Sequence, residues 1–308
     1  MKIIDPHIHL FNLEQGDYHW LKTENPPFWP DKPLINKTFT ENDLALNPPL
    51  ELSGFVHIEA GFDNKKPWRE LTWLEQACKK PFQAIAAIDL TLSRVNFQQQ
   101  LEMLAKFKSF IGVRHILDGE ALSLLNCPQV LSNFNVLNAF AKSNNRDLVF
   151  ETQLPLTEEV TISALCQVIN DNPNINFIIN HAGFPPIHTQ PAIKQKWHNN
   201  LNRLSAFPQV AIKCSGWEMV DRNHQPSWLE ENLTKIFSTF NSNKIMLASN
   251  FPLCFFSQCS YQAYWQLITS TSSFNELNHQ EKVALCYSNA YQHYQFKTIK
   301  TPLENQGI

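Results

Sequence analysis

Short apolar runs alternate with longer amphipathic segments along nearly the whole chain, and this alternation restricts the fold more than any other feature. The runs are rich in β-branched residues and predict buried strands within 1–10 and at 54–58, 84–89, 111–116, 148–152, 176–180, 209–213 and 244–248. The segments between them predict amphipathic helices, among them 68–79, 97–107, 130–144, 158–172 and 194–207. Eight apolar strands separated by helices predict an α/β fold with a parallel sheet, the (β/α)8 TIM barrel.

The domain organisation follows from length and from the absence of linkers in the sequence. At 308 residues, with no Gly/Ser-rich or low-complexity tract, the chain is expected to form one domain over 1–308. Residues 11–50 form a long connection that contains Tyr18, Trp20 and Trp29. A connection of this length is typical of a wall over a site, here the carboxyl-terminal rim of the barrel. A surface loop packed on its own aromatic side chains is an equally open interpretation.

Charge and cysteine content exclude several function classes. A formal net charge of −3 gives no electrostatic footprint for nucleic acid or for an anionic membrane. No charged and apolar leader and no bilayer-spanning apolar run is present, so we expect a cytoplasmic protein. The seven cysteines are scattered without a C-x-x-C pair, which favours reduced thiols over a disulfide framework or a thiolate zinc site.

Polar and charged residues stand where the predicted strands end, and in a barrel of this type the functional site lies at those ends. They are His7, His9, His57, Glu59, Asp89, Arg114, His115, Glu151, Gln153, Asn180, His181, Lys213, Ser215, Ser249 and Asn250. Any one of them alone is more often a structural hydrogen-bonding group. Together they predict a site rich in imidazole, carboxylate and amide groups at one rim.

The His7-Ile8-His9 sequence places two imidazoles on one face of the first strand, because side chains alternate along a strand. Two such rings make half of a divalent metal site. The alternative is that one ring is buried and hydrogen-bonded while the other ends the strand.

Six motifs, taken in order, carry a resemblance to a known family. They are Asp-Pro-His-Ile-His-Leu (5–10), Gly-Val-Arg-His-Ile-Leu (112–117), Glu-Thr-Gln-Leu-Pro (151–155), Asn-His-Ala-Gly-Phe-Pro (180–185), Lys-Cys-Ser-Gly-Trp (213–217) and Ala-Ser-Asn-Phe-Pro (248–252). The set resembles the amidohydrolase superfamily, and more closely the amidohydrolase 2 branch that contains sugar lactonases and 2-pyrone-4,6-dicarboxylate lactonase. The resemblance runs over essentially the whole chain.

The resemblance implies a hydrolase that opens a lactone or a related bond in a carboxylate-bearing small molecule through an activated water. In metal-using relatives the residues at His7, His9 and His181 surround a divalent ion, zinc or manganese, which acidifies water and polarises the carbonyl. Other relatives hold the substrate carbonyl with the same histidines and no ion, and the sequence leaves both cases open. A related decarboxylase, a lyase, is a second implied activity.

Asn250 departs from the family pattern, in which an aspartate at this place takes the proton of the attacking water. An amide has no titratable proton near neutrality, so Asn250 cannot be that base. Either Glu59 or Glu151 replaces it, or the chain is a catalytically silent ligand-binding barrel. The competing interpretation makes these two carboxylates internal partners of Arg114 and Lys213.

The expected substrate-binding groups include two cations on strands, and cations favour an anionic small molecule. The full set is Arg114, His115, Gln153, Lys213, Ser215 and Trp217. Internal ion pairs of the two cations are the structural alternative. No stretch requires a partner chain, and a homodimer through an apolar helix face stays open.

Overall fold

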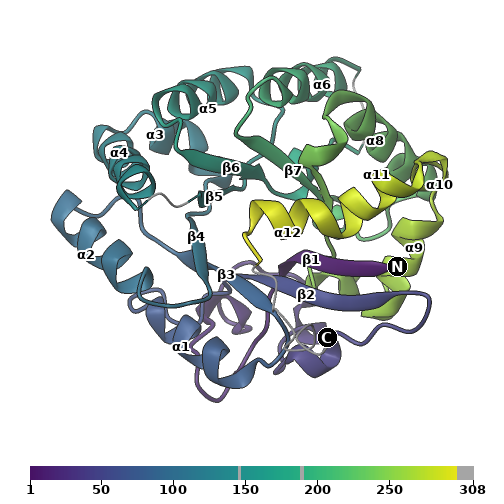
Figure 1. Ribbon diagram of the computed structural model, residues 1–308, viewed down its shortest axis with the longest axis horizontal. Coiled ribbons are helices and arrows are strands. Elements are labelled where there is room, and N and C mark those ends of the chain that lie inside the picture. Colours follow the sequence, from purple (N-terminus) through teal and green to yellow (C-terminus); the bar gives the residue numbers. More distant parts are fainter. Residues whose placement is uncertain (145–146, 188–190, 297–308) are drawn as a thin grey trace, which may run out of the picture.

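The computed structural model describes residues 1–144, 147–187 and 191–296, and these residues form a (β/α)8 barrel (Figure 1). Eight parallel strands pair in sequence order. They are β1 (Lys2–Ile8), β2 (Glu51–Ile58), β3 (Phe82–Ala87), β4 (Phe110–Arg114), β5 (Leu148–Thr152), β6 (Ile175–Ile179), β7 (Val210–Cys214) and β8 (Ile245–Leu247). A bridge between Ile8 and Phe251 brings the last strand back to the first. The predicted TIM barrel is confirmed.

Most of the helices surround the sheet on its outer side, as Figure 1 shows. The helices are α1 (Trp68–Ala77), α2 (Arg94–Leu104), α3 (Ala121–Leu125), α4 (Pro128–Ser143), α5 (Glu159–Asp171), α6 (Pro191–Ser205), α7 (Trp217–Val220), α8 (Pro226–Thr239), α9 (Tyr261–Ser270), α10 (Ser272–Glu276), α11 (His279–Val283) and α12 (Asn289–His293). In Figure 1, α12 lies across one end of the barrel, and the short α7 lies at the rim of a pocket. Among the described residues, none of these helices is long and apolar enough to cross a membrane.

The core has two layers because strand side chains alternate between the barrel interior and the surrounding helices. Ile4, Val56 and Ile111 belong to the inner cluster, whereas Ile3 and Phe55, their neighbours in sequence, belong to the outer cluster. The inner cluster also contains Tyr294 and Phe296, which follow α12. The C-terminal part of the described chain therefore closes one end of the barrel, and a site can open only at the other end.

The long connection 11–50 contains three 3-10 turns, η1 (His19–Leu21), η2 (Lys32–Leu34) and η3 (Glu41–Asp43). It packs on its own aromatic rings, with Phe11 at 5.3 Å from Tyr18 and 5.9 Å from Trp20 between ring centroids. It also reaches the rim, since the indole N–H of Trp20 donates to the Ala60 carbonyl at 2.8 Å. The segment therefore contacts both its own aromatic rings and the residue that follows Glu59.

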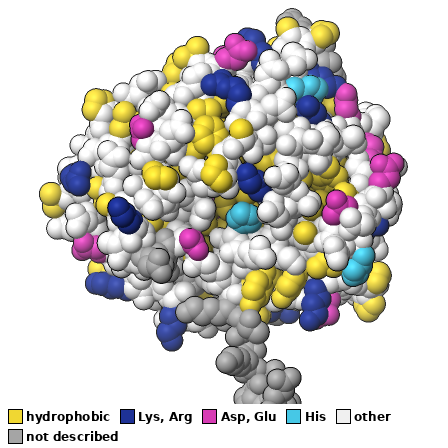
Figure 2. Space-filling model, turned by 45° about the horizontal axis from the view of Figure 1, so that its top comes forward, with side chains coloured by type: hydrophobic (Ala, Val, Ile, Leu, Met, Phe, Trp, Pro, Cys, Tyr) yellow, Lys and Arg dark blue, Asp and Glu magenta, His cyan; other side chains and the backbone are white. Residues whose placement is uncertain are grey.

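The outer surface carries charges of both signs. On the face in Figure 2, Lys and Arg side chains are interspersed with Asp and Glu side chains among the described residues. A mixed surface of this kind agrees with the formal net charge of −3.

Candidate active site

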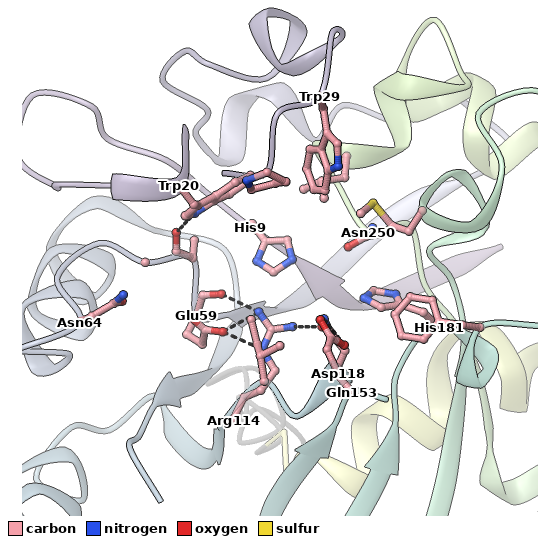
Figure 3. Close-up of a pocket in the computed structure, with 17 residues that line it drawn as sticks. His9, Trp20, Trp29, Glu59, Asn64, Arg114, Asp118, Gln153, His181 and Asn250 are labelled. Carbon is pink, nitrogen blue, oxygen red and sulfur yellow. Dashed lines mark hydrogen bonds and ion pairs between the residues drawn. The ribbon is translucent and has the colours of Figure 1, made fainter. Parts of the chain in front are cut away.

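A pocket of about 480 Å³ opens at the carboxyl ends of the strands (Figure 3). It is lined by His9, Trp20, Pro27, Trp29, Glu59, Ala60, Gly61, Asn64, Arg114, Ile116, Asp118, Gln153, His181, Phe184, Met219, Asn250 and Leu253. The strand ends supply its polar groups, because each predicted rim residue lies between one position before the last residue of a strand and three positions after it. The connection 11–50 supplies the indole rings of Trp20 and Trp29.

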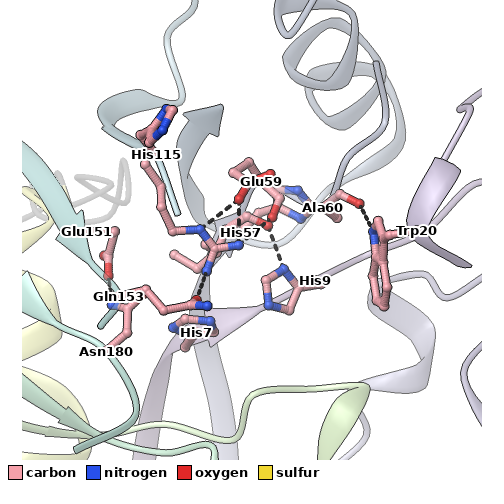
Figure 4. A network of polar contacts seen from close by, with 12 residues as sticks. His7, His9, Trp20, His57, Glu59, Ala60, His115, Glu151, Gln153 and Asn180 are labelled. Atoms are coloured by element: carbon pink, nitrogen blue, oxygen red, sulfur yellow. Dashed lines mark hydrogen bonds and ion pairs between the residues drawn. The ribbon is translucent and has the colours of Figure 1, made fainter. Parts of the chain in front are cut away.

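His9 follows β1, and its hydrogen bonding fixes the tautomer. Its Nδ1 lies 2.8 Å from the carbonyl oxygen of Ile58 (Figure 4). A carbonyl only accepts, so Nδ1 carries the hydrogen of the neutral ring. Burial, together with the nearby Arg114 charge, lowers the pKa of His9 well below its ordinary value. At neutral pH the Nε2 atom of His9 therefore presents a lone pair.

His181 stands just after β6, where the chain turns with positive φ angles of 51° at His181 and 53° at Ala182. Such angles cost non-glycine residues free energy and are concentrated at functional sites. The His181 Nδ1 atom lies 3.2 Å from Ser215 Oγ. Gly216 lies directly against the ring, since a Cβ atom there would be 2.3 Å from Nδ1. The two residues that follow β7, Ser215 and Gly216, therefore hold the imidazole of His181 in place.

His7 completes a cluster of three rings but does not line the pocket. Its ring centroid lies 5.1 Å from that of His9 and 4.6 Å from that of His181. Its Nδ1 atom lies 3.4 Å from Lys213 Nζ. Burial is the largest cause of the lowered pKa of His7, and the Lys213 charge adds to it.

Glu59 and Arg114 form a buried ion pair on the pocket wall. Arg114 Nε donates to Glu59 Oε1 at 2.7 Å, and Arg114 Nη2 donates to the Glu59 carbonyl at 2.9 Å (Figures 3 and 4). Arg114 Nη1 donates to Gln153 Oε1 at 3.1 Å, and Gln153 Nε2 donates to the Asp118 carboxylate at 3.2 Å. Among the described residues, none donates a hydrogen bond to Glu59 Oε2. This oxygen is the free acceptor of the pair.

Lys213 and Glu151 form a second ion pair, inside the barrel and outside the pocket lining. Both side chains are 0% exposed, and Lys213 Nζ lies 2.7 and 2.8 Å from the two carboxylate oxygens. Asn180 and the Tyr294 hydroxyl also donate to Glu151. Burial lowers the pKa of Lys213 to about 8, against the opposing effect of Glu151.

Asn250 lines the pocket and is held by a carboxylate that the sequence analysis missed. Asn250 Nδ2 donates to Glu218 Oε1 at 2.6 Å. Glu218 is 1% exposed on α7, and burial raises its pKa to about 7. The sequence feature that could have pointed to Glu218 is its place directly after the Ser215-Gly216-Trp217 segment. A helix of four residues gave that acid no recognisable face.

The structure brings half of the predicted site residues to the pocket. His9, Glu59, Arg114, Gln153, His181 and Asn250 line it, whereas His7, His115, Glu151, Lys213, Ser215 and Trp217 do not. Of the second group, His115 Nδ1 faces the Ile88 carbonyl at 3.1 Å, and Trp217 packs edge-on against Trp228. Ser215 contacts the pocket residue His181, with Oγ 3.2 Å from Nδ1.

A divalent metal fits the donor chemistry of the histidine cluster but not its arrangement. Neutral imidazoles are suitable ligands, and His7 Nε2 is buried without a hydrogen-bond partner among the described residues. Over the described ranges, however, no group of three or more His, Cys, Asp or Glu side chains is placed to hold a metal ion. Asn250, whose side chain is neutral, also offers no negative charge to a metal ion. These side chains, as they stand, do not form a metal centre.

Comparison with known proteins identifies relatives over the whole chain. An uncharacterized protein of Sinorhizobium fredii, y4mH, is 29% identical over 302 residues, which cover 95% of this chain and 98% of that protein. A Burkholderia multivorans amidohydrolase, solved once with bound HEPES and once with bound zinc, is 18% identical with a TM-score of 0.76 and coverages of 96% and 100%. A probable 2-pyrone-4,6-dicarboxylic acid hydrolase of Acinetobacter baumannii, solved with citric acid, is 17% identical with a TM-score of 0.66 and the same coverages.

The two structural likenesses show the shared barrel fold. The family follows from the sequence itself, because the profile of the amidohydrolase family matches residues 4–296. The chain belongs to the amidohydrolase family.

Proposed function

We propose that this protein hydrolyses a small lactone by attack of water on the ring carbonyl. One observation carries the proposal. A single pocket is lined by two neutral imidazoles, an oriented carboxylate and a carboxamide, and two indole rings form part of its wall. These groups belong to His9, His181, Glu59, Asn250, Trp20 and Trp29. Membership of the amidohydrolase family supports an enzyme, and this set of groups supports hydrolysis without a covalent intermediate.

The proposed base is Glu59. Arg114 occupies its Oε1 atom and fixes the plane of the carboxylate, which leaves Oε2 to accept a proton from water. Burial raises the pKa of Glu59, which makes it a stronger base than an ordinary glutamate, while the Arg114 charge opposes that rise. The other candidate base at this rim, Glu151, is paired with Lys213 and lies away from the pocket.

The proposed reaction uses only the lactone and one water molecule. The water oxygen bonds to the carbonyl carbon, and its proton passes to Glu59. His181, which donates from Nε2 when the Ser215 hydroxyl donates to Nδ1, stabilises the developing oxyanion. The acyl carbon–oxygen bond breaks, and the ring oxygen leaves as a hydroxyl after it receives the proton from Glu59.

The pocket charges favour a neutral, hydroxylated substrate over the anionic one expected from the sequence. That expectation depended on Arg114 and Lys213, and each of these cations has an internal carboxylate partner. Asp118 adds a further acid to the wall. His9 Nε2 and the Glu59 and Asp118 oxygens are acceptors suited to hydroxyl groups, and indole faces suit a flat ring.

The proposed reaction requires no metal ion, because Glu59 supplies the base and His181 the electrophilic hydrogen bond. Elemental analysis of protein purified without a metal-affinity column, combined with turnover before and after chelation, tests this part. We expect turnover without stoichiometric zinc or manganese. Loss of turnover on chelation, with recovery on adding zinc, would contradict it.

Proton release in a pH-stat tests the activity itself. Neutral hydroxylated γ- and δ-lactones are compared with lactones that carry one or two carboxylates, for the wild type, His181→Ala and the control His198→Ala on the outer helix α6. We expect turnover of neutral lactones that falls about 100-fold or more in His181→Ala and stays unchanged in the control. Faster turnover of the dicarboxylate would contradict the substrate assignment.

Two other outcomes would replace the proposal. Release of CO₂ from a carboxylic acid, with no ring opening, would make the protein a decarboxylase. Binding of a lactone or acid without any turnover would make it a ligand-binding barrel.

A further inference from the structure

Glu218 is a buried acid that the proposed reaction does not use directly. It is 1% exposed, lies near the start of α7 and follows the left-handed Gly216, whose φ angle is 67°. The pKa of Glu218 is raised to about 7, chiefly by burial. A buried acid is costly to keep ionised, so its position needs a reason beyond packing.

The contact with Glu218 gives the nitrogen and the oxygen of the Asn250 carboxamide different surroundings. A carboxylate oxygen accepts only, so the atom 2.6 Å from Glu218 Oε1 is the amide nitrogen, Nδ2. The other end, Oδ1, is buried and has no hydrogen-bond partner among the described residues. Asn250 itself lines the pocket with His9 and His181 (Figure 3). A buried acceptor left unpaired at a pocket wall is satisfied when a bound water or hydroxyl donates to it.

We propose that Glu218 is a positioning residue that holds the carboxamide of Asn250 with its nitrogen turned away and its oxygen free to accept a hydrogen bond from the attacking water. This inference rests on the proposed hydrolysis. The oxygen orients the water while Glu59 removes the proton. Asn250 then has a defined role although it cannot be a base.

The orientation depends on the charge of Glu218. The ionised acid can only accept, so it holds Nδ2 toward itself. A protonated acid has an O–H donor as well as an acceptor oxygen, so it also admits the flipped amide, in which Oδ1 accepts from the acid and the nitrogen faces the pocket. The groups that face Glu218 are Asn250, the cation Arg222, and the neutral side chains of Cys254 and Tyr264, whose pKa values are raised in part by its charge. Turnover is therefore expected to fall as the pH drops through the titration of Glu218.

A charge-swapped pair tests the role. Glu218→Gln leaves the amide without a fixed orientation, so kcat falls about tenfold or more with little change in KM, and the acidic limb from Glu218 disappears. Asn250→Asp places two carboxylates in contact, so one of them stays protonated and kcat falls. The double variant Glu218→Gln/Asn250→Asp restores one carboxylate and one carboxamide in contact, and we expect kcat to recover about tenfold or more over Asn250→Asp.

The control is Glu75→Gln, which removes an exposed acid of α1 that accepts from Ser109, outside the pocket lining. Its turnover and pH profile are expected to match the wild type. The proposal is overturned if Glu218→Gln keeps the wild-type kcat and pH profile, or if the double variant is no more active than Asn250→Asp.

A measurement without turnover separates this inference from the proposed function. In protein with ¹⁵N-labelled asparagine, the side-chain amide resonance of Asn250, assigned from Asn250→Ala, is followed from pH 5 to 9. We expect it to titrate in the wild type and to lose that titration in Glu218→Gln. An Asn250 resonance that is the same in both proteins refutes the pairing. Absence of lactone hydrolysis together with the expected titration refutes the function alone.

Discussion

Lys213→Met is the substitution whose consequence follows most directly from the structure. The Lys213 ammonium lies 2.7 and 2.8 Å from the two oxygens of Glu151, and both side chains are 0% exposed. Methionine fills similar volume without charge, so among the described residues Glu151 keeps only its uncharged donors, Asn180 and Tyr294. Removing one partner of a buried ion pair costs about 3–5 kcal/mol, because the other charge stays buried. That is a large part of the roughly 5–15 kcal/mol by which a domain is stable.

Urea unfolding at pH 7, followed by tryptophan fluorescence, gives the free energy of unfolding. Burial lowers the pKa of Lys213 to about 8, so the ammonium is still charged at this pH. The matched control is Glu151→Gln/Lys213→Met, which removes both charges at once. We expect it to recover most of the loss, because no uncompensated charge is left inside the barrel.

The reasoning is refuted if Lys213→Met loses less than about 1 kcal/mol, the range of a solvated surface pair. It is also refuted if the double variant is as unstable as the single one. Either result would mean that the buried pair of Lys213 and Glu151 does not contribute to stability in the way argued above.

Three further expectations follow from other parts of the site. Gly216→Ala would place a Cβ atom 2.3 Å from Nδ1 of His181 at a φ angle of 67°, so we expect displacement of the ring and a loss of kcat of about tenfold or more, measured beside a thermal melt. Trp20→Ala removes a pocket wall and should raise KM about tenfold, whereas Phe28→Ala, 74% exposed and outside the lining, should not; initial rates over a range of lactone concentrations distinguish them. Glu218 has a folded pKa of about 7 against 4.5, so its contribution to stability is present below pH 4.5 and is lost as the pH rises to about 7, a change of about 3 kcal/mol; unfolding free energies across this range should vary less in Glu218→Gln.

The fold could be predicted because it depends on local patterns. A run such as 148–152 is apolar enough to be recognised as a buried strand, and β5 occupies the same residues. The strand ends then place His9, His181 and Asn250 at one rim without knowledge of any contact. The end of the barrel closed by Tyr294 was not predictable, since it depends on packing between the last helix and the first strands.

Charge pairing could not be predicted, because it depends on distances between residues far apart in the sequence. Arg114 is 55 positions from Glu59, and Lys213 is 62 positions from Glu151. The sequence left each cation equally suited to a substrate carboxylate or to an internal partner. Glu218 was missed for the same reason, since its contact with Asn250 spans 32 positions.

The central claim is that water attacks the carbonyl carbon of a neutral lactone, and the position of an isotope label tests it most directly. A neutral hydroxylated lactone is turned over in H₂¹⁸O, and the ring-opened product is fragmented in a mass spectrometer. The account predicts one ¹⁸O atom in the carboxylate and none in the new hydroxyl, with labelled product formed about 100-fold or more slowly in His181→Ala. Label in the hydroxyl group, or no ring opening by the folded wild-type protein, would contradict it.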